Sequence, residues 1–564
     1  MVGVCIPLAV WLSIMPLNKA EADRAPMSAE KSKSSIALIE KAYQAGDIPL
    51  GDKVFNNLLA VAAPKTLPDV FQSEKTGVEK SGTPYIFEAV RYWDQMTPEQ
   101  QAVARTFFYR PILDSIYISP SGYFKIHYSH KWPDSVSTVD DDLSGVSDYV
   151  ERVGLYADSA YAHYQGTLGY LKPPADADGL YDIYLVNMGH DEYGRTWLES
   201  GGDSSWNDYR TYMEINCDLS NVSYQNQDPE GTLVGALKVV CAHEYFHATQ
   251  CAYDSFEDLW WMECTAVAYE DVLFPEVKDN LQFAPLFFDR ADTSLTAGPL
   301  RCYGAFVWPE FLMKQFGSGV IKEVFEYTRF YGIISSLDSA LKYYSSSMAK
   351  AYPHFAAWNY FTDMRADTAL YRNSPELPAM PIDRWVALCP FQGVTPNAAP
   401  DAFGCNYVVT YPDLNANNGL LKIDFDGGPT AVWGLSYMVF RGDSATIVPS
   451  VFVDTEGRSI AGIYDYQVYD SIVFVPAVVS RFYSNHQYEF GASIHPFGDT
   501  DGNGVRNLLD ILVLISRVYQ GGSNPYYDWR MGDLDCSGSL NLVDILWLID
   551  LVYYNGEEPT ACRY

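Results

Sequence analysis

The residues best suited to chemistry in this chain are His243, Glu244 and His247, in the segment His-Glu-Tyr-Phe-His. Two histidines four positions apart lie on one face of a helix, so both imidazoles can bind the same Zn²⁺ while the glutamate points at the metal's open position. Because only nine of the 564 residues are histidines, chance would give this pattern in about one such chain in a hundred. The alternative is a core helix whose histidines bond to backbone groups.

A catalytic zinc needs a third protein ligand and leaves its fourth position to water. One class of zinc peptidase uses a histidine six residues after the second one, but Tyr253 stands there. The other class takes a glutamate from a following helix, and Glu263 lies sixteen residues after His247. The apolar run from Leu233 to Ala242 predicts a buried helix that leads into the motif.

The segment Trp-Trp-Met-Glu-Cys-Thr-Ala around Glu263 resembles the third-ligand region of gluzincin zinc peptidases, particularly those of the aminopeptidase type. From about residue 35 to residue 363 the chain is similar to a family of secreted, multidomain bacterial proteins described as gluzincin metallopeptidases, which often end in a dockerin-like module. This resemblance implies a zincin-like α+β core and zinc chemistry, but no particular substrate. It is carried by the zinc motif and by residues 119–128, 148–151, 181–187 and 303–317.

The same resemblance implies roles for two more residues. Glu270 stands where these enzymes often carry a glutamate close to a zinc histidine, so we expect it to fix the orientation and tautomer of that ring. Tyr303, just before Gly304, resembles the tyrosine that donates to the oxyanion. The chain has 43 tyrosines, and a packing role for Tyr303 is the alternative.

Together these residues predict hydrolysis of a peptide or protein substrate. Zn²⁺ bound by His243, His247 and Glu263 would activate a water, and Glu244 would take its proton and pass it to the leaving amine. The strand-like stretch 181–187 is the expected sheet edge for an extended peptide. Two alternatives remain: hydrolysis of a non-peptide amide or ester, and a non-catalytic, calcium-stabilised surface or scaffold protein with a degenerate peptidase fold.

A repeat with a period of 34 residues occupies the end of the chain. Oxygen ligands at loop positions 1, 3, 5, 7 and 12, with glycine at position 6, are typical of Ca²⁺-binding loops. The pair of loops, each followed by an apolar helix, resembles a type I dockerin, which implies two Ca²⁺ ions and a cohesin-like partner. The expected ligands are Asp499, Asp501, Asn503, Val505 and Asp510 in the first loop, and Asp533, Asp535, Ser537, Ser539 and Asp544 in the second.

The residues that follow each loop asparagine are apolar, namely Leu508, Leu509, Leu542 and Val543. Dockerins often carry polar partner-recognition residues there. Docking onto a cohesin-like partner and an intramolecular cap that buries this apolar face are therefore both open.

A third acidic loop precedes the zinc motif. Its residues match positions 1, 3, 5, 9 and 12 of the same calcium scheme, with Gly145 at position 6. A plain acidic turn is the alternative to a third Ca²⁺ site. The candidate ligands are Asp140, Asp142, Ser144, Asp148 and Glu151.

The composition indicates an exported protein. A formal net charge of −33 disfavours binding to nucleic acid or to anionic membranes. An apolar run over residues 2–17, followed by Ala20-Glu21-Ala22, predicts a signal peptide, and no later segment predicts a transmembrane helix. Among the ten cysteines, Cys536 with Cys562 and Cys389 with Cys405 form natural local pairs.

A chain of this length should contain several domains. We expect an α+β zincin-like core over residues 111–375, a β-sandwich over 376–495 and an α-helical, dockerin-like calcium module over 496–564. Residues 1–22 would be the signal peptide. Residues 23–110 are helical in pattern and are either a propeptide or a domain retained in the mature protein.

Overall fold

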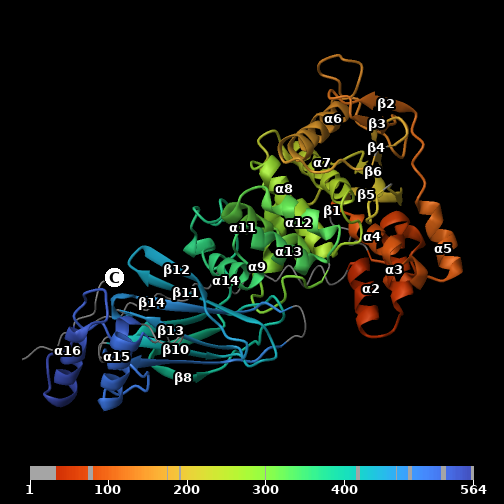
Figure 1. The fold of residues 1–564 in the computed structure, drawn as a ribbon. Helices are drawn as coiled ribbons and strands as arrows, with labels where there is room; N and C mark the ends of the chain where they lie inside the picture. The colour runs from red at the N-terminus through yellow and green to blue at the C-terminus, as the bar shows by residue number, and fades with distance from the viewer. Residues whose placement is uncertain are drawn as a thin grey trace, which may run out of the picture.

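The computed structural model describes residues 34–559, apart from 74–79, 175, 190–191, 203, 299, 414–418, 465, 481–484 and 522–528. The expected signal peptide, residues 1–22, lies outside the described residues. The chain is multidomain and mixes helices with three β-sheets (Figure 1). No helix in the described part of the chain is long and apolar enough to cross a membrane.

A six-stranded sheet with the order β1-β5-β6-β4-β3-β2 organises the central region. Its strands β3, β4 and β6 run parallel, and β5 is antiparallel to β6. Every residue of β4 is buried, as expected for a strand covered on both faces. The strand bounds are Lys80–Ser81 (β1), Ser115–Ile118 (β2), Phe124–Tyr128 (β3), Tyr181–Val186 (β4), Glu192–Gly201 (β5) and Tyr209–Asn216 (β6).

The prediction that residues 181–187 form a sheet edge is wrong. Strand β4 pairs with β3 on one side and with β6 on the other, so its backbone groups are already used within the sheet. The strand next to the edge is β5, whose outer side carries only the two-residue strand β1.

Helices α6 (Asp148–Tyr161), α7 (Thr232–Gln250) and α8 (Leu259–Leu273) pack beside this sheet, with α7 between the other two. Helix α7 is buried from Val234 to Gln250 because it is apolar on nearly all sides. Further helices continue this layer: α9 (Ala284–Phe288), α10 (Arg301–Gly304), α11 (Val307–Phe316), α12 (Val320–Thr328), α13 (Ile333–Tyr343) and α14 (Met348–Trp358).

The N-terminal helices cover the other face of the sheet. Ile183 and Leu185 of β4 belong to the core around α7, whereas Tyr184 and Val186 join the apolar cluster of the N-terminal helices. Residues 34–110 therefore share their core with the sheet instead of forming a separate body. Their helices are α2 (Ser35–Gln44), α3 (Leu50–Ala62), α4 (Thr83–Arg91) and α5 (Pro98–Ala104).

Two sheets stacked over a shared apolar core follow the helical layer. Helix α14 packs on β11, β12 and β14, which joins this part to the central region. One sheet has the order β12-β11-β14-β9-β7 and the other β13-β10-β15-β8. The bounds are Arg384–Cys389 (β7), Phe391–Val394 (β8), Val408–Pro412 (β9), Leu420–Asp426 (β10), Trp433–Arg441 (β11), Ser444–Val451 (β12), Arg458–Ile463 (β13), Ser471–Val478 (β14) and Glu489–His495 (β15).

The predicted disulfide between Cys389 and Cys405 is wrong, because both thiols are buried and free. Cys389 pairs across β7 and β9 with Pro412, seven residues beyond Cys405. At about 3.3 Å per strand residue this places the two cysteines roughly 20 Å apart. Cys536 is disulfide-bonded, and its predicted partner, Cys562, lies outside the described residues.

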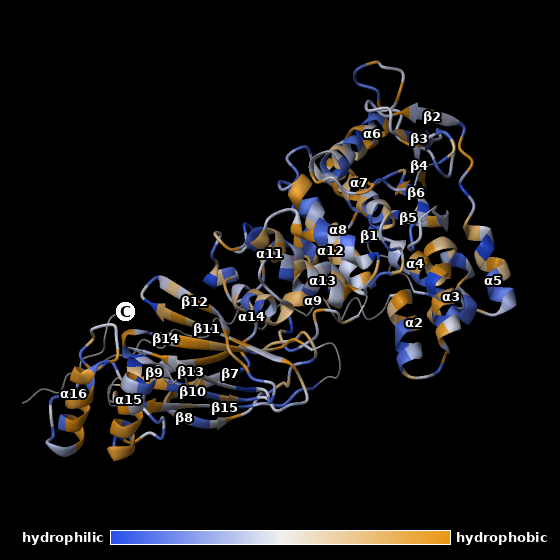
Figure 2. Ribbon diagram, in the orientation of Figure 1, coloured by the Kyte–Doolittle hydropathy of each residue, from blue (hydrophilic) through white to orange (hydrophobic). Residues whose placement is uncertain are grey.

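Helices α15 (Leu508–Gln520) and α16 (Leu542–Tyr553) lie side by side at the C-terminal end (Figure 1). Their inward residues pack with Leu420 and Phe497 of the preceding part. Both helices are strongly hydrophobic (Figure 2). No described part of the chain forms an intramolecular cap over the apolar face, because its residues remain 51–57% exposed: Leu508, Leu509, Leu542 and Val543.

Candidate metal centre

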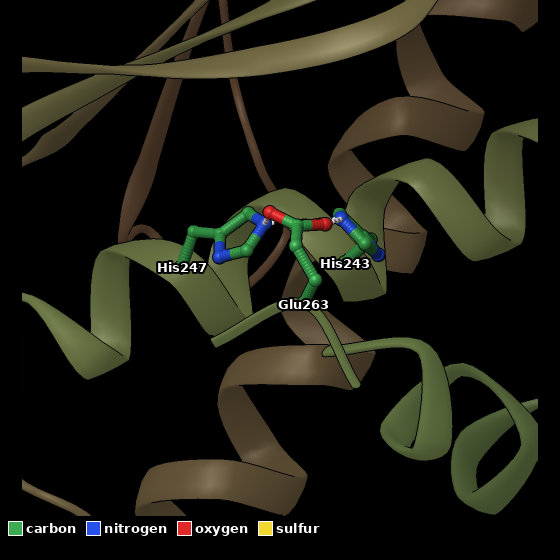
Figure 3. Close-up of side chains that lie close together, drawn as sticks. All are labelled: His243, His247 and Glu263. Atoms are coloured by element: carbon green, nitrogen blue, oxygen red, sulfur yellow. Dashed lines mark hydrogen bonds and ion pairs between the residues drawn. The ribbon is translucent and has the colours of Figure 1, made fainter. Parts of the chain in front are cut away.

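Helices α7 and α8 bring His243, His247 and Glu263 together (Figure 3). One ligand atom from each lies within 4.8 Å of the others. The two Nε2 atoms are 3.0 Å apart, and the Glu263 carboxylate lies 3.3 Å from Nε2 of His243 and 3.1 Å from Nε2 of His247. All three side chains are buried.

The outer nitrogens of both histidines already have partners. Nδ1 of His243 lies 2.7 Å from Oε1 of Glu270, and Nδ1 of His247 lies 2.8 Å from Oε1 of Gln250. A carboxylate or amide oxygen accepts, so each Nδ1 donates and each Nε2 is directed at the other ring and at Glu263, where it can bind a cation once it has released any proton of its own. Two imidazole nitrogens and a carboxylate that converge in this way fit a bound cation.

The donor set selects the kind of cation. Two imidazole nitrogens and one carboxylate are ligands that suit Zn²⁺, with a position left for water. The carboxylate oxygens of Glu263 make no regular hydrogen bond to any described residue, so they are available as ligands. The residues present therefore fit the zinc site that the sequence predicts.

The electrostatics agree with this arrangement. Burial alone would lower the pKa of His243, but Glu263 and Glu270 outweigh it and raise the pKa to about 10. Burial would raise the pKa of Glu263, but His247 and His243 lower it to about 2. The carboxylate is therefore ionised, and positive charge is favoured between it and the rings.

Gln250 is a functional candidate that the sequence did not identify as such. Its Nε2 donates to the carbonyl of Met262 at 2.8 Å and to Oγ1 of Thr265 at 3.0 Å. These bonds fix the amide so that its oxygen faces His247. The residue lies three positions after His247 on the same helix, and this spacing was the available signal.

Glu270 is held on its other side by Lys80. Nζ of Lys80 contacts Oε2 of Glu270 and lies 2.6 Å from Oδ2 of Asp279. Burial lowers the pKa of Lys80, but the two carboxylates outweigh it, so the pKa is raised and the ammonium is charged. No local pattern points to Lys80, because it lies 190 residues from Glu270.

Glu244 is fully buried and points toward strand β5. Its Oε2 accepts 2.8 Å hydrogen bonds from the hydroxyls of Thr83 and Thr196, while Oε1 has no partner among the described residues. Gly194 permits this close approach of β5 to α7, since a Cβ there would lie 2.7 Å from Val240 and 3.1 Å from Cγ of Glu244.

Tyr303 lies beside the histidines in α10. Its ring is stacked with that of His243 at a centroid distance of 6.4 Å, and it contacts Phe283 at 5.1 Å. Burial and the charge of Glu263 raise the pKa of Tyr303 well above its usual value, so its hydroxyl keeps its proton. This position suits both the predicted donor role and the packing alternative.

A cavity of about 520 Å³ reaches Glu263 from between the N-terminal helices and the central region. One wall carries Pro84, Tyr85 and Phe87 of α4, and the opposite wall carries residues 255–260. The approach to the metal centre is therefore shaped by residues 34–110.

The C-terminal loops gather their acidic residues as the repeat predicts. Asp499, Asp501 and Asp510 have oxygens within 4.8 Å of one another, and so have Asp533, Asp535 and Asp544. Gly504 and Gly538, at φ +89° and +81°, make the sharp turns, and their N–H groups donate to Asp499 and Asp533.

The other predicted ligands of these loops take part in local bonds. The carbonyl oxygens of Val505 and Ser539 accept from the side-chain amides of Asn507 and Asn541. Oδ1 of Asn503 accepts from the N–H of Val505, and the hydroxyl of Ser537 donates to the carbonyl of Ser539.

The earlier acidic loop is gathered in part. Asp140, Asp142 and Asp148 have oxygens within 4.8 Å of one another. The N–H of Ser144 donates to Asp140 and Asp142. Glu151 lies in the first turn of α6 and is not part of this group.

Comparisons with known proteins do not assign this chain. No family model matches it, and no curated protein matches it significantly. The inference of function therefore rests on four buried residues: His243, Glu244, His247 and Glu263. Such a group can bind a cation that polarises a carbonyl and can accept a proton next to it.

Proposed function

We propose that this protein is a secreted zinc-dependent metallopeptidase of the gluzincin type, with an α+β zincin-like core. The observation that carries the proposal is that a side-chain oxygen lies within hydrogen-bonding distance of Nδ1 in each of the two histidines. Glu270 and Gln250 hold the two Nδ1 protons, so both Nε2 atoms face Glu263. A core helix with histidines bonded to backbone groups would not need this arrangement.

His243, His247 and Glu263 would hold Zn²⁺, which acidifies a bound water and polarises the substrate carbonyl. Glu244 acts as the general base. Its Oε2 accepts from the hydroxyl of Thr196 on β5, whereas Oε1 has no partner among the described residues and is the oxygen that can take a proton. The protonated Glu244 then donates to the leaving amine.

Tyr303 is the candidate donor to the oxyanion, because it carries an O–H beside the ring of His243. Glu270 and Gln250 act as positioning residues, since they bond to Nδ1 of the two histidines, on the side of each ring away from Glu263.

The C-terminal pair of loops and helices is proposed to be a dockerin-like module that binds two Ca²⁺ ions. In each loop three carboxylates converge, and they would repel one another without a cation. The exposed face of Leu508, Leu509, Leu542 and Val543 favours a protein partner, for which a cohesin-like domain is the candidate. The third loop, with Asp140, Asp142 and Asp148, is a further candidate Ca²⁺ site.

The substitution Glu244→Gln tests the peptidase proposal. We expect it to abolish cleavage of a peptide library while zinc content stays stoichiometric, because it removes only the proton acceptor. Glu310→Gln on α11, outside the site, is the matched control and should keep full activity. Cleavage that survives both Glu244→Gln and chelation by phenanthroline would overturn the mechanism.

A further inference from the structure

The proposed site is closed to a polypeptide in this structure. His243, Glu244 and His247 are each 0% exposed and Glu263 is 1% exposed. A scissile bond has to reach Glu244 and the zinc that the other three residues would hold. Among the elements that cover these four residues, α4 comes from the N-terminal region 34–110 and contacts Glu244 and His247 directly, and β1 precedes it on the outer side of β5.

Strand β1 occupies the outer side of β5. Lys80 pairs with Glu192 and Ser81 with Gly194, in parallel orientation, and the N–H of Gly82 lies 3.3 Å from the carbonyl of Gly194. An exposed strand edge is a template for an extended peptide, because its backbone groups need partners. Residues 80–82 therefore use the edge that an extended substrate would use beside Glu244.

The next residues cover the proposed general base and one histidine. The hydroxyl of Thr83 donates to Oε2 of Glu244 at 2.8 Å and accepts from the N–H of Thr196 at 2.7 Å. One turn further along α4, the ring of Phe87 contacts the ring of His247 at 6.2 Å. Helix α4 thus stands over the metal centre from its first turn onward.

Lys80 anchors this segment. Its ammonium is 2% exposed and lies between Glu270 and Asp279, both buried. A charged group is stable at such depth only when it is paired, so the contact holds residues 80–83 against the central region.

We propose that the N-terminal region 34–110 is an internal inhibitor, in which residues 80–87 occupy the place of an extended polypeptide on β5. This inference rests on the proposed peptidase function. Of the two alternatives for this region, it favours a propeptide over a domain retained in the mature protein. A polypeptide substrate enters only after residues 80–87 withdraw from β5 and from Glu244.

The connection to the central region is suited to cleavage. Residues 110–114 have no regular secondary structure, and the side chain of Ile112 is 99% exposed. Exposed irregular segments are the usual sites of proteolytic nicking. A cut there breaks the covalent link between the N-terminal region and β2, and all proposed zinc ligands and Glu244 lie on the C-terminal side of the cut.

The first test displaces the segment in the uncut chain. A Cβ at Gly82 would lie 2.5 Å from Oε1 of Glu192 on β5 and 2.7 Å from Cγ1 of Val61 on α3, so Gly82→Ala crowds residues 80–83 between α3 and β5 and weakens their contact with β5. Its φ of −83° suits alanine, so the backbone itself is not strained. Gly166→Ala is the matched control, because nothing lies within 4 Å of its Cβ.

Two readouts apply to the zinc-loaded chain: cleavage of a long unstructured polypeptide, and the rate at which a chelator extracts zinc. We expect Gly82→Ala to raise the cleavage rate and the zinc extraction rate at least about tenfold over wild type, because weakening an inhibitory segment shifts its equilibrium toward the open form. Gly166→Ala should leave both rates unchanged. A permanent wall of the site predicts the opposite sign, since displacing it would lower cleavage.

The second test inserts the recognition sequence of a specific protease between Ile112 and Leu113. Cutting this site should raise both readouts, and the specific activity should increase on dilution, because inhibition becomes intermolecular. Faster zinc extraction without cleavage in any form would support occlusion and refute the peptidase. Cleavage and extraction that neither Gly82→Ala nor cutting increases would overturn the inhibitor proposal, as would full activity of the uncut wild type.

Discussion

Gln250 offers a sharp test of how the metal centre is built. Gln250→Met keeps the length of the side chain and removes both its acceptor and its donors. His247 then loses the 2.8 Å bond that fixes its ring, and the carbonyl of Met262 loses a 2.8 Å donor. Outer partners of metal-bound histidines are worth about 10- to 100-fold in metal affinity, which corresponds to about 1.4–2.7 kcal/mol.

The same substitution also lowers stability without metal. The carbonyl of Met262 loses this donor but lies inside α8, where its helical hydrogen bond and the hydroxyl of Thr265 at 3.2 Å remain, so the loss of one buried hydrogen bond costs about 0.5–1.5 kcal/mol. Thr265 is affected less, since its hydroxyl also bonds to the carbonyl of Trp261 at 2.7 Å. The two effects must therefore be measured separately, as the zinc dissociation constant by chelator competition and as the melting temperature of the metal-free protein.

Gln165→Met is the matched control. Gln165 donates to Thr249 on α7, the helix that also carries Gln250, at 3.1 Å and to the carbonyl of Leu171 at 3.3 Å. It makes no hydrogen bond to His243 or His247. We expect Gln165→Met to lower the melting temperature only. If Gln250→Met lowers the melting temperature but leaves zinc affinity within twofold of wild type, Gln250 serves packing and the inferred positioning of His247 is wrong.

Three further predictions follow from the described contacts. Glu263→Ala should purify without stoichiometric zinc, whereas Glu270→Ala should retain it with affinity weakened about 10- to 100-fold; the reverse metal contents would exchange the two roles. Burial raises the pKa of Glu257 to about 7, so the folded state holds a proton that the unfolded state loses near pH 4.5. Between these two pH values the free energy of unfolding should therefore fall by about 1.4 kcal/mol per pH unit as pH rises. Denaturant unfolding of Glu257→Gln should show a flatter dependence of this free energy on pH, and equal slopes for variant and wild type would contradict the prediction. Removal of Ca²⁺ by EGTA should make residues 496–559 the first to be digested, since the carboxylates of the two loops repel one another; equal resistance with and without EGTA would show that the loops are acidic turns.

Local patterns anticipated the parts of the molecule whose partners are close in sequence. His243 and His247 lie on one face of the same helix, and the loop aspartates lie within twelve residues of one another, so spacing was enough to predict that each group converges. The helix that leads into the motif begins at Thr232, one residue before the predicted start at Leu233. It could be predicted because its residues are apolar on nearly all sides.

Contacts between distant segments could not be predicted in this way. Thr83 lies 161 residues from Glu244 and Lys80 lies 190 residues from Glu270. The wrong prediction of a sheet edge at residues 181–187 has the same origin. An apolar strand has the same sequence pattern whether it pairs with one neighbouring strand or with two. Cys389 and Cys405 are close in sequence, which suggested a disulfide. The register of β7 and β9 keeps the two cysteines apart.

The pairing of β1 with β5 also bears on what kind of substrate the site would accept. The hydrogen bond at this edge runs between backbone groups, from the N–H of Gly82 to the carbonyl of Gly194. Recognition through main-chain bonds depends on an extended conformation more than on particular side chains. If residues 80–82 stand in for a substrate, selectivity must then come from the walls next to Glu263, where the cavity of about 520 Å³ lies. The wall formed by α4 would leave together with the N-terminal region, so the open enzyme should cleave unstructured polypeptides with broad sequence tolerance, and its uncut form should not.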